Sequence, residues 1–117
     1  MRLSVWRRSI ELIAECYRLS RRFPKEELFC LTSQLRRAAI SVGTNIAEGN
    51  GRAHRKEYLH HLSISQGSLT EVETLLVLSG LLGYSTEASL RTAHGLADET
   101  GRMLTVMRRR LGAGTRE

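Results

Sequence analysis

The 117-residue chain has few aromatic residues, two cysteines, one proline and no long apolar run. Aromatic residues make up only 5% of it, so few side chains are available to stack on the bases of a nucleic acid. Two cysteines are too few for a disulfide scaffold, and no segment reaches the roughly 20 apolar residues of a membrane span. Glu11 and Glu15 interrupt what would have to be the apolar core of a signal peptide. We therefore expect a soluble, cytoplasmic protein with no membrane partner.

Hydrophobic residues make up 41% of the chain, and they recur at helical spacing through nearly its whole length. A chain of this size buries roughly two-thirds of the surface that it exposes when unfolded, which is enough for a core without metal or disulfide support. The sequence predicts one domain over residues 1–111 and a flexible C-terminal tail over residues 112–117.

The net charge of +6 is unevenly distributed. Residues 1–56 contain twelve basic residues (Lys or Arg) and five acidic ones (Asp or Glu). Residues 57–90 contain no basic residue and four acidic ones, and residues 91–117 contain six basic and three acidic residues. Both ends of the chain are therefore basic, whereas the middle is acidic. Sixteen of the eighteen cations are arginines, whose guanidinium groups bind carboxylates or phosphates in a bidentate manner. This balance permits binding to nucleic acid or to an acidic protein, but does not require it.

The first predicted helix ends near Phe23, because Pro24 disfavours helical geometry in the residue before it and suits the first turn of a second helix. The first helix carries one expected inward stripe, with a second apolar group beside it. The stripe is Leu3, Trp6, Ile10, Ile13 and Tyr17, and the neighbouring group is Leu12, Cys16 and Leu19.

Three further helices follow from the same periodicity. The second ends at the glycines of residues 49–51, the third begins between residues 53 and 56 and ends at Gly83, and Ser85 or Thr86 caps the fourth. Their predicted core stripes are Leu28, Leu31, Leu35, Ala38, Val42 and Ile46, then Tyr58, Leu62, Ser65, Leu69, Val72 and Leu76, then Leu90, Ala93, Ala97, Thr100, Leu104, Met107 and Leu111. Four helices joined by short turns predict an all-α, antiparallel up-and-down bundle.

Residues 31–42 (LTSQLRRAAISV) and 45–49 (NIAEG) resemble the signature of the bacterial four-helix-bundle family named after the 23S rRNA intervening-sequence protein. Supporting matches include the turn at residues 23–27 (FPKEE), Gly67 with Ser68, and Glu71. The resemblance implies a ring-shaped homopentamer related to the accessory variability determinant of diversity-generating retroelements. It thereby implies RNA or DNA and a reverse transcriptase as partners.

The sequence departs from the family pattern at two positions. Gly43 stands where many members have a proline, and Gln66 stands where a basic residue often precedes the Gly-Ser pair. If that basic position contacts phosphate in relatives, the contact is absent from this chain.

The third helix also carries a second stripe, which suits contact with another subunit and consists of Ile64, Ser68, Glu71, Leu75, Leu78 and Leu82. On this stripe a Glu71 carboxylate without a cationic partner would cost several kcal/mol. We therefore predict an ion pair from Arg36 or Arg37 to Glu71 or Glu48. The remaining polar groups would be satisfied by Gln34 and Asn45. The favoured role of this network is structural, fixing helix register or a subunit interface, rather than catalytic.

Glu57 and His60 form a single Glu-x-x-His element of the kind that di-iron helical bundles use twice. The adjacent His60 and His61 point about 100° apart on a helix and cannot share an ion in the way that residues one turn apart do. The sequence predicts no metal site and no cofactor.

Cys16 and Cys30 lie seven residues on either side of Phe23. A tight helical hairpin could place them at the same height and allow a disulfide. The alternative, which we favour, is two buried and reduced thiols.

No nucleotide-binding loop, nucleophile motif or catalytic acid pair is present in the sequence, which predicts a non-enzymatic protein. In an antiparallel bundle, cations from three segments would meet at one end and contact nucleic acid without strong sequence specificity. These residues are Arg7, Arg8, Arg52, Arg55, Lys56, Arg108, Arg109 and Arg110. The main alternative is a protein-interaction scaffold with no nucleic-acid role, and a weaker one is an enzyme that uses Glu48, Glu57 and the histidines.

Overall fold

The computed structural model describes residues 2–112 and consists of four α-helices and one short 3₁₀ turn, with no strand in that range. The helices are α1 (Arg2–Ser20), α2 (Leu31–Asn50), α3 (Arg55–Leu81) and α4 (Glu87–Gly112), and the 3₁₀ turn η1 spans Lys25–Glu27. Within residues 2–112, no helix is both long enough and apolar enough to cross a membrane.

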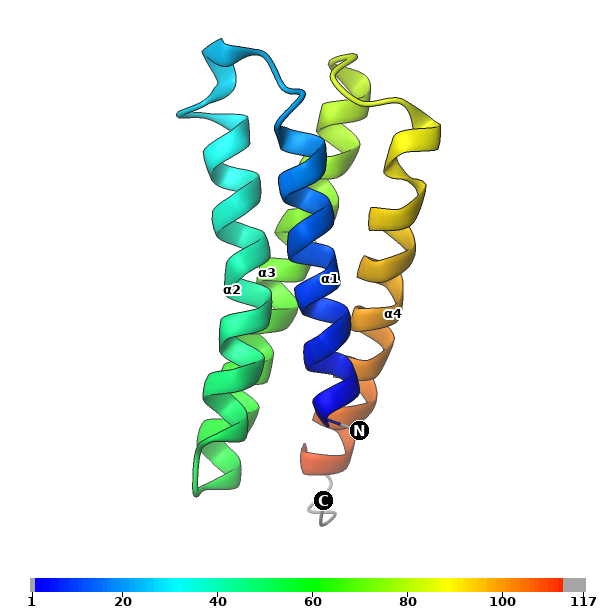
Figure 1. Cartoon of the computed structure of the whole chain (residues 1–117). Helices are drawn as coiled ribbons and strands as arrows, with labels where there is room; N and C mark the ends of the chain where they lie inside the picture. Colours follow the sequence, from blue (N-terminus) through cyan, green and yellow to red (C-terminus); the bar gives the residue numbers. More distant parts are fainter. Residues whose placement is uncertain (1, 113–117) are drawn as a thin grey trace.

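The helices run antiparallel and form a bundle in which each helix packs on two neighbours (Figure 1). α1 contacts α2 and α4, and α3 contacts the same two helices from the other side. The molecule measures 46 × 25 × 18 Å along its principal axes, as expected for rods packed side by side. The predicted all-α up-and-down bundle is confirmed.

The core follows the predicted stripes of α3 and α4, and that of α2 from Leu31 onward, whose members are all buried. In α1 the predicted stripe is only partly right: Ile13 packs against the core, and the side chain of Leu3 lies outside the described part of the structure. Trp6 and Ile10 are 38% and 41% exposed, whereas the neighbouring stripe through Leu12 enters the core together with Ser9. Ser9 can occupy this apolar seam because its hydroxyl donates to the backbone carbonyl of Trp6, which satisfies the buried polar group.

The connection between α1 and α2 also differs from the prediction. After Pro24 the chain makes only the η1 turn, and α2 begins at Leu31 rather than near the proline. Cys30 interrupts helical geometry with φ −123° and ψ −104°, which leaves Leu28 outside the core. The Glu27 carboxylate accepts a hydrogen bond from the Leu31 backbone N–H at 3.2 Å, and so satisfies a free donor at the start of α2.

The remaining helix ends agree with the sequence. Gly83 ends the α3 region with a φ of +81°, a conformation that favours glycine. Thr86 caps α4, because its Oγ1 accepts from the Ser89 N–H while the Ser89 Oγ accepts from the Thr86 N–H, both at 3.0 Å. α4 includes Gly112, one residue past the predicted boundary, and the rest of the predicted tail lies outside the described residues.

Candidate functional site

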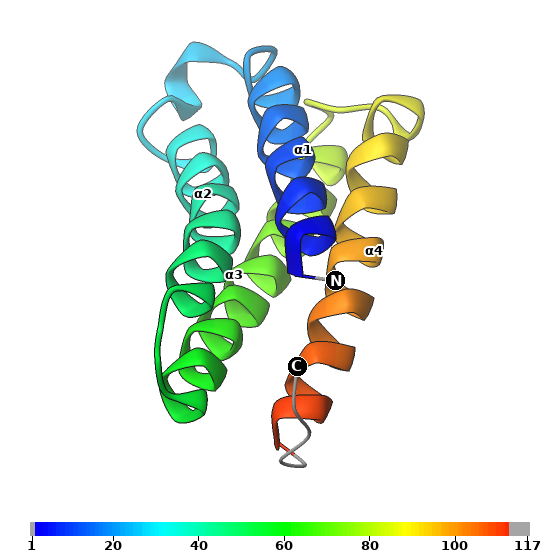
Figure 2. The same cartoon turned by 60° about the horizontal axis from the view of Figure 1, so that its bottom comes forward.

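The start of α1, the turn between α2 and α3, and the end of α4 lie at the same end of the bundle (Figure 1). Viewed toward that end, the α2–α3 turn and the end of α4 lie on opposite sides (Figure 2). The topology thus brings to one end the cations that the sequence singled out, and we call it the basic end. Its members are Arg7, Arg8, Arg52, Arg55, Lys56, Arg108, Arg109 and Arg110.

Three of these cations have partners within the protomer. Arg8 Nε donates to Glu99 Oε2 at 2.9 Å, and this hydrogen bond is the main cause that raises the pKa of the Arg8 guanidinium. Arg52 pairs with Glu48 at 2.8 Å, one helical turn earlier. Arg108 makes a long hydrogen bond to a glutamine on α3 at 3.5 Å.

The other five, Arg7, Arg55, Lys56, Arg109 and Arg110, are exposed and make no ion pair with a residue that the structure describes. A cation without a carboxylate partner remains able to bind a phosphate from outside. These five residues are therefore the part of the predicted set best suited to an anionic ligand.

The predicted ion pair of Arg36 or Arg37 with Glu71 or Glu48 is wrong for the protomer. Arg36 Nε instead donates to Ser20 Oγ at 2.8 Å, with its guanidinium carbon 4.6 Å from the centre of a tyrosine ring on α1. Glu48 pairs with Arg52, which lies in the turn after α2. Glu71 is exposed, so water hydrates its carboxylate and the core does not require a partner for it.

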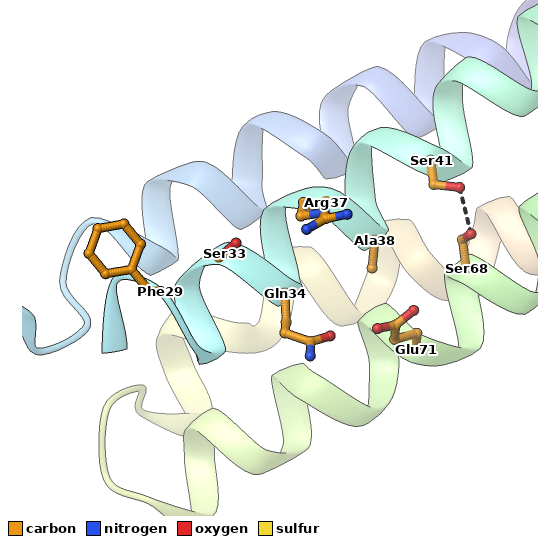
Figure 3. Close-up of a pocket in the computed structure, with 8 residues that line it drawn as sticks. All are labelled: Phe29, Ser33, Gln34, Arg37, Ala38, Ser41, Ser68 and Glu71. Carbon is orange, nitrogen blue, oxygen red and sulfur yellow. Dashed lines mark hydrogen bonds between the residues drawn. The ribbon is translucent and has the colours of Figure 1, made fainter. Parts of the chain in front are cut away.

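Arg37 and Glu71 instead line opposite sides of a hollow of about 450 Å³ between α2 and α3 (Figure 3). We call this hollow the α2–α3 groove. Figure 3 shows Gln34 from the predicted network on the same surface and Phe29 near one end of the hollow, where its side chain is 88% exposed. Neither Arg37 nor Glu71 makes an ion pair with a described residue, so a cation and an anion are both left available for an outside partner.

Sequence reasoning missed a set of hydrogen bonds that crosses from α2 to α3. Ser41 Oγ and Ser68 Oγ lie 2.7 Å apart, and Asn45 Oδ1 and His61 Nδ1 lie 3.0 Å apart. The buried Ser65 hydroxyl donates to a backbone carbonyl of α2 at 2.8 Å. Along the sequence, the two residues of each pair lie at nearly equal distances on either side of the turn near residue 53. Such residues face each other in an antiparallel helical hairpin, so this spacing could have predicted the contacts.

The two cysteines are both unpaired and occupy different environments. Cys16 is buried, and desolvation raises the pKa of its thiol to about 12. Cys30 is exposed, so the prediction that both thiols are buried is wrong for this residue. Among residues 2–112, no group of three or more His, Cys, Asp or Glu side chains is arranged to hold a metal ion.

The fold and the basic end define a small four-helix-bundle protein with a polycationic tip. The chain belongs to the 23S rRNA-intervening sequence protein family, whose model matches residues 1–106. It is also similar to a solved structure described as a protein of unknown function from the S23 ribosomal protein family of Bacteroides thetaiotaomicron. That similarity has a TM-score of 0.82 at 22% identity and covers 89% of this chain and 97% of the other. No curated protein matches the chain at a significant level.

Proposed function

We propose that the protein is a non-enzymatic accessory protein that binds RNA or DNA through backbone phosphates at its basic end. The observation that carries this proposal is the gathering at that end of five cations that form no ion pair with any residue in the range 2–112. Phosphate contacts of this kind carry no base readout, and the scarcity of aromatic residues agrees with weak sequence preference.

Salt dependence tests the electrostatic mode directly. If five cations per protomer each neutralise a phosphate of a single strand, a plot of the logarithm of the binding constant against the logarithm of the salt concentration has a slope of about −3.5. This slope corresponds to a roughly 100-fold loss of affinity between about 50 and 200 mM salt. Fluorescence anisotropy with a labelled 20-mer measures this slope. An absence of binding at 50 mM salt would refute the proposal and favour the protein-interaction scaffold.

A matched pair of variants separates the basic end from net charge. Replacing Arg55, Lys56 and Arg109 by Gln is expected to weaken binding strongly and flatten the salt slope. The control replaces Arg21, Arg22 and Lys25 by Gln, which removes the same charge from exposed positions at the opposite end. Equal losses from the two variants would show that charge alone, without its placement, governs binding.

We further propose that copies of the chain assemble, as the family resemblance implies, into a ring-shaped homopentamer. A closed ring needs two different complementary surfaces on each protomer. The α2–α3 groove suits one of them, since it offers the exposed ring of Phe29 together with Arg37 and Glu71, neither of which pairs with another residue of the part of the chain that the structure describes. In this arrangement the basic ends of all copies contribute to one surface and multiply the phosphate contacts.

Light scattering coupled to size exclusion tests the assembly. The expected mass is five times the 13.2 kDa of the chain. Phe29→Ser and Glu71→Gln should lower the mass, whereas Glu87→Gln, an exposed position in the first turn of α4, should leave it unchanged. A monomeric wild-type protein at micromolar concentration would refute the ring.

A further inference from the structure

A second hollow, of about 470 Å³, opens at the basic end beside the α2–α3 turn. It is lined by Arg52, Lys56, Glu57, His60 and His61. Arg52 and Lys56 can only donate hydrogen bonds, whereas the Glu57 carboxylate can only accept them. A bare phosphate needs donors alone, so this mixed lining suits a ligand that carries both a phosphate and a hydroxyl group.

The hydrogen bonds behind the hollow fix the tautomer of His61. Asn45 Nδ2 donates to the Ser41 backbone carbonyl at 3.0 Å, which orients the amide because a carbonyl oxygen cannot donate. Asn45 Oδ1 therefore faces His61 Nδ1 at 3.0 Å and accepts a hydrogen bond from the Nδ1–H group. In the tautomer that carries its proton on Nδ1, Nε2 is a hydrogen-bond acceptor, and no described residue donates to it.

We infer that this hollow is a ribonucleotide subsite that makes the protein prefer RNA to DNA. The inference rests on the proposed nucleic-acid function and names its substrate class. Lys56, together with the Arg52 nitrogens that Glu48 does not engage, binds the phosphate. His61 Nε2 accepts a hydrogen bond from the ribose 2′-hydroxyl, a donor that deoxyribose lacks. Asn45 is the positioning residue, since it holds the ring and its tautomer.

The test compares three labelled 20-mers of one sequence, made as RNA, as DNA and as 2′-O-methyl RNA, in anisotropy titrations at pH 7.5 and constant salt. Loss of one hydrogen bond predicts that RNA binds about fivefold more tightly than DNA. The 2′-O-methyl strand should bind like DNA, because its oxygen carries no hydrogen. This arm uses only the wild-type protein and does not depend on the folding of a variant.

Variants then assign the preference to His61. His61→Phe should abolish the preference, so that RNA and DNA bind with equal affinity. His94→Phe, the same change at an exposed site on α4, should alter neither affinity. Equal affinity of the wild type for RNA and DNA, or a preference that survives His61→Phe, would overturn the inference while leaving the proposed function intact. Absence of binding to every strand at 50 mM salt would overturn both.

Discussion

Gly49 lies in close contact with α3, and its replacement by alanine tests that packing. The residue is buried in the last turn of α2. A Cβ at this position would lie 2.9 Å from Tyr58 Cδ1 and 3.0 Å from His61 Cβ. The Cβ of His61 is fixed to its backbone, so this contact can relax only if α3 itself moves.

Two opposing effects set the magnitude for Gly49→Ala. Overpacking of a tight contact costs about 1–3 kcal/mol. Removing a helical glycine returns at most about 1 kcal/mol, and less near a helix end. We therefore expect a net loss of about 1–2 kcal/mol in the free energy of unfolding. Gly67→Ala is the control, since a Cβ at that position would meet nothing within 4 Å apart from its chain neighbours and the nearby backbone of α3. The free energy of unfolding should therefore rise by about 0.5–1 kcal/mol.

Urea unfolding followed by circular dichroism at 222 nm, at one protein concentration, measures both changes. The midpoint should fall for Gly49→Ala and rise for Gly67→Ala. A Gly49→Ala protein as stable as the wild type, alongside a stabilised Gly67→Ala, would show that the two helices separate at no cost. That result would refute the close packing of α2 on α3.

Other predictions follow from single contacts. Arg36→Met should lower the free energy of unfolding by about 1–2 kcal/mol, because it removes a hydrogen bond to Ser20 and a cation–π contact, whereas Arg91→Met, at an exposed position on α4, should stay within about 0.5 kcal/mol in urea unfolding. A thiol reagent at pH 8 should modify Cys30 alone in the native protein and both cysteines after unfolding. The reason is that only the thiolate form reacts, and burial, which raises the pKa of Cys16, keeps its thiol protonated at this pH. The Cys16 thiol has a pKa of about 12 in the folded state against an ordinary value of 9.0, so the unfolded chain loses this proton first. Stability measured by urea titration should therefore decline as the pH rises from about 9, and Cys16→Ala should reduce that decline.

The fold was largely predictable because apolar periodicity alone marks the buried face of a helix that has one apolar stripe. α4 is such a helix, and its predicted seam is the observed one. α1 has two adjacent apolar stripes that both fit the helical period. The stripe that enters the core contains Ser9, whose polarity counts against it until the local hydrogen bond to Trp6 is known. Apolar periodicity alone does not predict that hydrogen bond.

The location of the basic end could be predicted from the sequence, whereas the long-range ion pair of one of its arginines could not. Chain order and antiparallel topology suffice to bring the cations of three segments to one end. The pairing of Arg8 with Glu99 joins residues 91 positions apart, and it depends on how α4 is rotated against α1. The pairing of Arg52 with Glu48 is an i, i+4 contact, which helical spacing alone could have suggested.

The packing at Gly49 and the proposed recognition of RNA meet at His61, which gives a last prediction. The Cβ introduced by Gly49→Ala presses on His61 Cβ and so displaces the imidazole from Asn45. Gly49→Ala should therefore reduce both stability and the ratio of RNA to DNA affinity, whereas Arg36→Met should reduce stability and leave that ratio unchanged. Unfolding and anisotropy measurements on both variants decide the matter. If Gly49→Ala is destabilised but keeps the wild-type ratio, the helix crossing does not set the position of the imidazole, and the Asn45 hydrogen bond holds the ring by itself.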